Sequence, residues 1–315
     1  MRFRDLAIVA GVLLLAGFAV ADALRGHGSD GREAGPSASV PTRIERPPGR
    51  PPAVPVAATG RLLFADVGTC DLHEYDVATG EQLGRPALST CKFSAAPRGE
   101  HIAYGIGGTG FRLLDLADPF APHGIFRAGL PTVVWSLDGE RAAWCDANGA
   151  YMRSFEWSSA RLLPRCPVAI DPAGRPAYVD GTRLVAGGRT VYRASHPIRW
   201  ARWSSAGRLV IEQRDGTLRR ADARFGIRVP AWAARQHPTL APDGCTAAFL
   251  RDRRIELFSL CHRPEGRTFI GAAAAFSPDS RWLAVAARRG LSFYRLVGSP
   301  TVVRWAFSAA ALAWR

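Results

Sequence analysis

The sequence predicts an all-β protein, a seven-bladed β-propeller, because one short phrase recurs along most of the chain. The phrase is an apolar residue, a small polar turn that ends near Gly, and an alternating apolar run; it is cleanest at 276–285, FSPDSRWLAV. The residues that end its turns lie 33 to 40 positions apart: Gly99, Gly139, Gly174, Gly207, Gly244 and Ser280. A regular period in this range is typical of a solenoid or a propeller. Short alternating segments separated by Gly, Pro and Asp turns favour the propeller, with six or eight blades as the alternatives to seven.

Residues 1–24 are expected to form a hydrophobic helix that targets the chain to the membrane. Two arginines precede a largely apolar run, 6–21, which is slightly shorter than the roughly twenty residues that a spanning helix needs. The run ends in Ala-Val-Ala, the small-x-small form of a signal-peptidase site. The segment is therefore a signal anchor, or a signal peptide cleaved after Ala21, and the rest of the chain is exported in both cases. We expect a single-pass protein of the cell membrane with an extracytoplasmic propeller; the alternative is a secreted domain.

Residues 25–60 are expected to form a disordered linker that acts as a tether between the membrane and the folded domain. Seven of these positions are proline, and Gly, Ser and Arg fill much of the rest. Such a composition cannot bury enough apolar surface to fold, and it keeps a chain extended and semi-rigid. The tether would hold the propeller, residues 61–315, away from the bilayer.

Each repeat in 61–315 is interpreted as four short strands, A to D, ordered from the centre of the ring outward. In the last full repeat the strands are 273–277, 282–287, 291–296 and 301–307. The chain then ends in another strand A, 309–315, whereas the first repeat, 61 to about 89, supplies only strands B, C and D. The last segment is therefore expected to complete the first blade and to remove two free sheet edges. The seven expected strand A anchors are Phe93, Trp135, Ile170, Trp203, Leu240, Phe276 and Trp314.

The repeat phrase carries a family resemblance. FSPDSRWLAV at 276–285, WSLDGERAAW at 135–144 and LAPDGCTAAF at 240–249 are similar to the phrase F-S-P-D-G-x-x-[IL]-A. In this the chain resembles the WD-repeat-like and TolB-like β-propellers, over about 255 residues. Ser280 and Ala173-Gly174 depart from the Asp-Gly form of the turn. The resemblance implies a propeller scaffold and no single activity, because a fold does not fix a function.

The chain contains six cysteines, and an even number on an exported chain favours disulfides over metal binding or catalysis. One pair brackets a hairpin whose turn is 251–254. Its two members are equidistant from residue 253, so they should face each other across the ladder within disulfide reach. Two further pairs share a separation of 21 residues, and each runs from a B–C turn to the next D-to-A crossing. We expect the disulfides Cys70–Cys91, Cys145–Cys166 and Cys245–Cys261, with unpaired core thiols as the alternative.

The formal net charge of +14 is concentrated in one half of the propeller. Residues 61–197 carry fourteen basic and fourteen acidic side chains. Residues 198–315 carry twenty basic and eight acidic side chains, a net charge of +12. Such asymmetry points to an anionic partner for the basic half.

The B–C turns of the last three full repeats are rich in arginine, and all B–C turns of a propeller project from one face. Arginine forks suit phosphate and carboxylate groups. The candidate binding residues are Arg214, Arg251, Arg253, Arg254, Arg288 and Arg289. An arginine-rich, solvated rim without a partner is the alternative interpretation.

No motif in the sequence indicates a particular reaction, metal or cofactor. Residues 105–110 match G-x-G-x-x-G, but the next segment alternates like a strand, and a dinucleotide site requires a helix there. We therefore expect a glycine-rich hairpin turn. The seven histidines show no zinc-ligand spacing. Neither a metal site nor a cofactor is expected.

The predicted function is non-enzymatic binding at the cell envelope, with an envelope protein or an anionic polymer or lipid as the partner. No nucleic acid is expected. The alternative is a propeller hydrolase or lyase that acts on an envelope glycan, because a propeller can assemble an active site from residues remote in the sequence. A deep central pocket lined with acids and histidines would favour the enzyme. A broad basic rim around a plugged channel would favour the binding module.

Overall fold

The computed structural model describes residues 58–84, 86, 88–106, 110–118, 123–126, 133–157, 159–262, 266–288, 290–298 and 301–315. The expected signal segment, 1–24, and most of the expected tether, 25–57, lie outside these residues, so the membrane anchor and the cleavage after Ala21 stay predictions. Within the described ranges, no helix is long and apolar enough to span a membrane.

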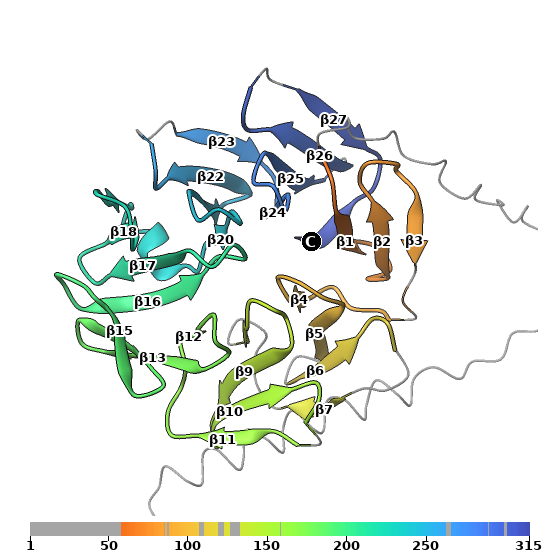
Figure 1. Ribbon diagram of the computed structural model, residues 1–315. Coiled ribbons are helices and arrows are strands. Elements are labelled where there is room, and N and C mark those ends of the chain that lie inside the picture. Colours follow the sequence, from red (N-terminus) through yellow and green to blue (C-terminus); the bar gives the residue numbers. More distant parts are fainter. Residues whose placement is uncertain are drawn as a thin grey trace, which may run out of the picture. The chain divides into compact units, whose positions relative to one another are not determined.

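The strands of the described residues pair into seven four-stranded antiparallel sheets, which follow one another around a ring in the order of the sequence (Figure 1). The predicted seven-bladed β-propeller is thereby confirmed, and the alternatives of six and eight blades are wrong. Strand A of each blade lies innermost, as Figure 1 shows for the A strands β4, β12, β20 and β24.

The blades have the following strands, each given from A to D. Blade 1 is β28 (Ala309–Trp314), β1 (Arg61–Asp66), β2 (Leu72–Asp76) and β3 (Gln82–Gly84). Blade 2 is β4 (Phe93–Ala95), β5 (His101–Ile106), β6 (Gly110–Asp115) and β7 (His123–Phe126). Blade 3 is β8 (Val134–Trp135), β9 (Arg141–Asp146), β10 (Gly149–Ser154) and β11 (Arg161–Leu163). Blade 4 is β12 (Ala169–Ile170), β13 (Pro176–Asp180), β14 (Arg183–Ala186) and β15 (Arg189–Arg193).

The remaining three blades make up the basic half of the ring. Blade 5 is β16 (Ile198–Trp203), β17 (Leu209–Gln213), β18 (Thr217–Arg220) and β19 (Ile227–Arg228). A short 3₁₀ turn, Ala233–Arg235, leads to blade 6, which is β20 (Thr239–Leu240), β21 (Thr246–Arg251), β22 (Arg254–Ser259) and β23 (Arg267–Ile270). Blade 7 is β24 (Ala273–Phe276), β25 (Trp282–Ala287), β26 (Gly290–Arg295) and β27 (Val302–Trp305).

The recurring phrase produces the blades because its turn residue adopts the left-handed backbone conformation. All six turn-ending residues have positive φ, from 63° at Ser280 to 82° at Gly139. Glycine takes this conformation without steric cost. Ser280 stands in place of glycine in blade 7, and its hydroxyl accepts a hydrogen bond from the backbone N–H of Asp243 in blade 6 (3.0 Å). Glycine could not make this contact between blades.

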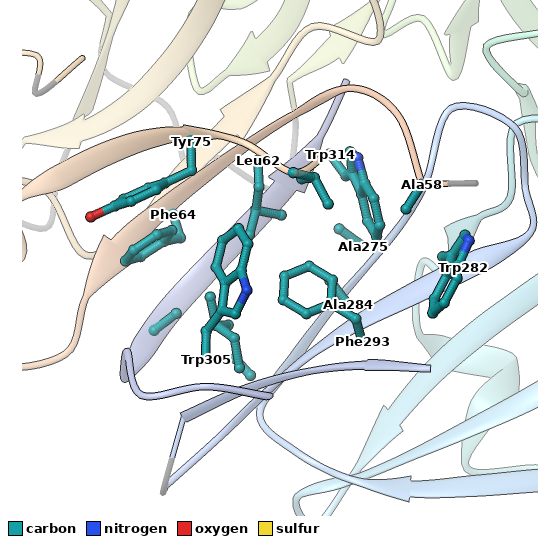
Figure 2. Packing of buried hydrophobic residues seen from close by; sticks show 14 residues of the cluster. Ala58, Leu62, Phe64, Tyr75, Ala275, Trp282, Ala284, Phe293, Trp305 and Trp314 are labelled. Atoms are coloured by element: carbon teal, nitrogen blue, oxygen red, sulfur yellow. The ribbon is translucent and has the colours of Figure 1, made fainter. Parts of the chain in front are cut away.

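The last strand of the chain closes the ring, as predicted. β28 pairs antiparallel with β1, so that Trp314 lies opposite Leu62 and Ala311 lies opposite Ala65. A buried cluster packs the seam between blades 7 and 1, and in it the rings of Trp314 and Phe293 meet edge-on with centroids 5.5 Å apart (Figure 2). The first sheet is therefore completed by residues almost the whole domain away in sequence.

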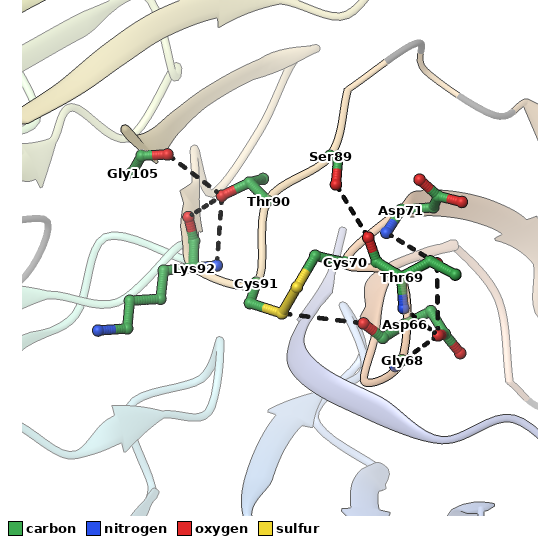
Figure 3. Close-up of a disulfide and its surroundings, with 10 residues drawn as sticks. All are labelled: Asp66, Gly68, Thr69, Cys70, Asp71, Ser89, Thr90, Cys91, Lys92 and Gly105. Carbon is green, nitrogen blue, oxygen red and sulfur yellow. Dashed lines mark hydrogen bonds between the residues drawn. A yellow bond between two sulfur atoms is a disulfide. The ribbon is translucent and has the colours of Figure 1, made fainter. Parts of the chain in front are cut away.

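Three disulfides join the predicted cysteine pairs. Cys70–Cys91 ties the B–C turn of blade 1 to the crossing that leaves the blade, with the Cα atoms 4.6 Å apart (Figure 3). Beside it the Ser89 hydroxyl donates to the carbonyl oxygen of Thr69 (2.9 Å), which links the same two segments. In blade 3 the disulfide Cys145–Cys166 makes the equivalent link from the end of β9, with a Cα–Cα distance of 5.7 Å.

The third disulfide, Cys245–Cys261, joins the start of strand B to the end of strand C in blade 6, with the Cα atoms 5.1 Å apart. The prediction that the two cysteines lie directly opposite each other is wrong by one position. Thr246 lies opposite Ser259, and the N–H of Leu260 donates to the carbonyl oxygen of Cys245 (2.7 Å). Leu260 is therefore the cross-strand partner of Cys245, and the disulfide runs to the next residue along.

The glycine-rich segment 105–110 joins two paired strands, as predicted. Gly105 lies opposite Phe111, and Ile106 lies opposite Gly110. A strand, β6, therefore follows these glycines where a dinucleotide site would require a helix.

Candidate functional site

Five of the six candidate arginines lie within the described residues, and all five are exposed at B–C turns of three consecutive blades. They are Arg214 in blade 5, Arg251, Arg253 and Arg254 in blade 6, and Arg288 in blade 7. The sixth, Arg289, lies outside the described residues. We term these six residues the arginine face.

The backbone of each of these turns is held by the crossing that leaves its blade. In each blade a carbonyl oxygen of the B–C turn accepts a hydrogen bond from that crossing. The three bonds are Val229 N–H to Gly216 (3.0 Å), Gly271 N–H to Arg253 (2.8 Å) and Ser308 Oγ–H to Arg288 (3.4 Å). The turns are thus fixed through their main chain, which leaves the arginine side chains available for other contacts.

The hairpin between β21 and β22 places an arginine where glycine is usual. Its two central residues, Asp252 and Arg253, have φ values of 47° and 62°. Positive φ at both central positions defines the turn that Asn-Gly and Asp-Gly normally form. A side chain in this conformation costs on the order of 1 kcal/mol relative to glycine. Backbone strain of this kind clusters at functional sites, and this favours a role for Arg253 in binding.

The guanidinium groups of the arginine face are largely unpaired within the molecule. Among the described residues, those of Arg214, Arg253, Arg254 and Arg288 make no hydrogen bond or ion pair. The four lie in the turns listed above. Arg251 has Nε 3.5 Å from the Asp252 carboxylate and its guanidinium 5.2 Å from the centre of the Trp232 ring, and the Arg251 side chain is half exposed. The guanidinium donors of Arg214, Arg253, Arg254 and Arg288 are therefore free to bind phosphate or carboxylate groups.

An ion pair between Arg199, whose side chain is 33% exposed, and Glu212 supports the turn of blade 5. The Glu212 side chain is fully buried; it accepts hydrogen bonds from Arg199 Nη1 (2.6 Å) and Trp200 Nε1 (2.5 Å). The other Arg199 terminal nitrogen donates to the carbonyl oxygen of Arg214 (3.2 Å). Burial raises the pKa of Glu212 to about 6, and the Trp200 hydrogen bond and the Arg199 charge offset part of that rise. The pair is a positioning element for Arg214, and the sequence analysis missed it.

The strand A anchors surround a central cavity of about 350 Å³. All seven anchors predicted from the repeat phrase line it, one from each blade: Phe93, Trp135, Ile170, Trp203, Leu240, Phe276 and Trp314. Its charged lining consists of Arg202 and Arg315, and no described lining residue is an acid or a histidine. A pocket lined with acids and histidines would favour a glycan-cleaving enzyme, and such a lining is not found among the described residues of this cavity. In the same ranges, no three His, Cys, Asp or Glu side chains are grouped so that they could hold a metal ion.

Comparisons with known proteins identify similar folds. No protein-family model matches the sequence, and no curated protein sequence matches it. TolB from Acinetobacter baumannii has a TM-score of 0.48 and 13% identity, over 81% of this chain and 66% of that chain. The β-propeller domain of Myceliophteria thermophila Cps50 (Swd1) has a TM-score of 0.45 and 15% identity, over 70% and 87%. A functionally unknown protein from Desulfotomaculum acetoxidans DSM 771 has a TM-score of 0.47 and 12% identity, over 81% and 99%.

The propeller scaffold that the family resemblance implied is confirmed by the seven four-stranded sheets of this structure. Identities of 12% to 15% carry no residue of a site from one protein to another. The chain also spans only 66% of the length of the TolB chain. Function must therefore be argued from the surfaces of this propeller itself.

Proposed function

We propose that this protein is a binding module of the cell envelope that holds an anionic partner on its arginine face. The hydrophobic segment 1–24 would export the propeller, as a single-pass anchor or as a cleaved signal, and the tether 25–60 would hold it off the bilayer. The partner would be an envelope protein, polymer or lipid that presents phosphate or carboxylate groups. Three disulfides support an exported location, because disulfides persist in oxidising compartments and are rare in the cytosol.

One observation carries the proposal: exposed arginines without intramolecular partners occupy equivalent turns of three consecutive blades. These blades belong to the half of the propeller with a net charge of +12. Charge attraction between exposed groups is screened beyond about 8 Å at physiological ionic strength. Binding should therefore require close contact with several anionic groups, and it should weaken steeply as salt is added.

The test replaces all six residues of the arginine face by serine. Binding of the exported domain to polyphosphate and to phosphatidylglycerol vesicles is measured over a range of salt concentrations. The wild-type domain should bind at least one probe with strong salt dependence, and the variant should lose at least about tenfold in affinity, a change of roughly 1.4 kcal/mol. The melting temperature should stay nearly unchanged, because exposed turn side chains contribute little packing.

The control removes the same charge from other exposed positions. Its six Arg→Ser changes are at Arg161, Arg165, Arg183, Arg189, Arg193 and Arg224. The control should keep most of the affinity. If it loses as much as the arginine-face variant, net charge alone is acting and the arginine face is only a solvated rim. If the wild-type domain binds neither probe, the anionic partner is wrong.

Location is tested separately from binding. A full chain tagged at its C-terminus is expressed, and intact cells are treated with a protease. The protease should remove the propeller if the domain is exported. Carbonate extraction then separates an anchored chain, which stays in the membrane fraction, from a cleaved one, which is released. Protection of the propeller in intact cells would contradict the envelope location.

A further inference from the structure

The central cavity opens toward the end of the blades that is opposite the arginine face. It adjoins a second hollow of about 500 Å³, whose lining shares Pro97, Ser205, Pro242, Trp314 and Arg315 with that of the cavity. The shared residues lie at A–B turns or at the end of β28. In antiparallel blades the A–B turns and the B–C turns lie at opposite ends of the sheets. A ligand in this cavity would therefore be remote from the arginine face.

The mouth of the cavity is narrowed by one contact across the ring. Arg98, in the A–B turn of blade 2, donates from Nη2 to the carbonyl oxygen of Ser205 in the A–B turn of blade 5 (3.1 Å). These two blades are separated in the ring by blades 3 and 4. The contact favours a small molecule over a polymer as the occupant.

Arg202 gives the cavity one cation that is not neutralised. It lies on β16 opposite Val210, is partly buried, and lines the cavity. Its guanidinium makes no hydrogen bond or ion pair with any residue that the structure describes. Burial lowers the pKa of Arg202, and burial and then the Arg202 charge lower the pKa of His237.

The second cation of the cavity is already compensated. Arg315 Nη2 lies 2.8 Å from a Glu74 carboxylate oxygen and 2.7 Å from a Glu100 carboxylate oxygen, and its side chain is only 5% exposed. Arg202 is thus the lone unpaired charge among the described lining residues. A partly buried cation without a partner is unfavourable, and a bound anion would relieve that cost.

We propose that the central cavity binds a small organic carboxylate, with the carboxylate on the Arg202 guanidinium and an apolar body against the aromatic wall. A single guanidinium matches one carboxylate in charge and in fork geometry. The aromatic part of the wall consists of Phe93, Trp135, Trp203, Phe276 and Trp314. The cavity volume of about 350 Å³ is within the range of small-molecule sites. This site is independent of the proposed function.

The test compares carboxylates with their neutral amides on the wild-type protein. Calorimetry is run with benzoate, 3-phenylpropionate and hexanoate, each beside the matching amide. At least one carboxylate should bind, and its amide should bind about tenfold more weakly or worse, because the charge-assisted hydrogen bonds are lost. If no carboxylate binds, or if amide and carboxylate bind equally, the site is wrong.

Variants then assign the binding to Arg202. Arg202→Met should lower carboxylate affinity at least about tenfold and raise the melting temperature of the unliganded protein, because it removes an unpaired cation. Arg202→Lys should retain part of the affinity. Arg224→Met, at an exposed arginine between β18 and β19, is the matched charge control and should leave binding unchanged.

Two results would overturn the assignment. One is an Arg224→Met variant that loses as much carboxylate affinity as Arg202→Met. The other is full carboxylate affinity in a folded Arg202→Met variant. The six-serine variant of the arginine face should bind the carboxylate like the wild type, so that a failure of the proposed function leaves this site testable.

Discussion

Blades 1 and 3, in the neutral half of the ring, secure the end of strand B differently from blades 5 to 7 in the basic half. In blades 1 and 3 the link to the crossing that leaves the blade is covalent, through Cys70–Cys91 and Cys145–Cys166. In blades 5 to 7 the described link is a hydrogen bond to a turn carbonyl, of the kind that Ser89 makes beside the disulfide in blade 1, and the turns carry the arginine face. The end of strand B thus carries a disulfide in blades 1 and 3, and it carries an exposed, arginine-rich turn in blades 5 to 7.

The comparison separates the scaffold from the binding surface. Both halves have buried aromatic clusters between blades, with Phe111 and Trp144 in the neutral half and Trp200 and Phe249 in the basic half. The net charge differs, being zero over 61–197 and +12 over 198–315. Stability should therefore be shared around the ring, and anion binding should be confined to one side of it.

The largest expected effect on stability comes from deleting the strand that closes the ring. Deleting 309–315 removes β28, exposes the inner edge of β1 and takes Trp314 out of the seam cluster. The loss should be several kcal/mol, a large share of the roughly 5–15 kcal/mol that stabilises a typical domain. Thermal and urea unfolding measure it. A truncated domain that melts within about a degree of the full one would contradict the closure.

Removing the disulfide of blade 1 should destabilise the propeller and leave anion binding to the arginine face unchanged. The double variant Cys70→Ser, Cys91→Ser opens a loop with a sequence separation of 21 residues, and the expected loss is about 3 kcal/mol. Urea unfolding measures the loss, and polyphosphate affinity should not change. The double variant Cys245→Ser, Cys261→Ser is the control within the basic half, with a separation of 16 residues and a similar expected cost. A fall in affinity confined to the blade 1 variant would show that the halves are not independent.

Glu212 gives the basic half a distinct pH dependence. Its folded-state pKa of about 6 is above the ordinary value of 4.5, so its contribution to stability is complete below pH 4.5 and is lost as the pH rises through 6. The shift corresponds to about 2 kcal/mol. The unfolding free energy of the wild type minus that of Glu212→Gln should fall by about this amount between pH 4 and pH 7. A difference that is flat or rises over this range would refute the assignment.

The smallest expected effect is at the strained arginine of blade 6. Arg253→Gly should stabilise the domain by up to about 1 kcal/mol, because glycine takes a φ of 62° without steric cost. The same change should lower polyphosphate affinity if the side chain binds. Arg254→Gly is the control, because Arg254 is the first residue of β22 and is not among the residues with positive φ. It should be destabilising. If the two changes have equal effects on stability, the conclusion that the positive φ of Arg253 strains the backbone is wrong.

The parts of the fold that could be predicted from the sequence are periodic or local. The repeat phrase predicts the blade count, the closing strand and the seven strand A anchors, because each depends on one turn and its flanking alternation. The hairpin register was off by one, because the turn of blade 6 has two central residues and its centre falls between Asp252 and Arg253. The point about which the two strands of the hairpin are symmetric cannot be determined from the spacing of the cysteines alone.

The parts that could not be predicted depend on geometry across strands. The contact between Arg199 and Glu212 depends on an irregularity in the β16–β17 register between Ile198 and Trp200. Nothing in the sequence marks that shift. Arg202 was missed because the repeat phrase begins at Trp203, and which neighbouring side chains reach the cavity depends on how strand A is rotated in the ring.

Hydrogen–deuterium exchange with and without polyphosphate tests most directly whether anion binding belongs to one half of the ring. Peptides that cover the B–C turns of blades 5, 6 and 7, at 213–217, 251–254 and 287–290, should become protected when the probe is added. Peptides that cover the B–C turns of blades 1 to 4 should exchange as before. Equal protection in both halves, or protection confined to the A–B turns, would contradict the account.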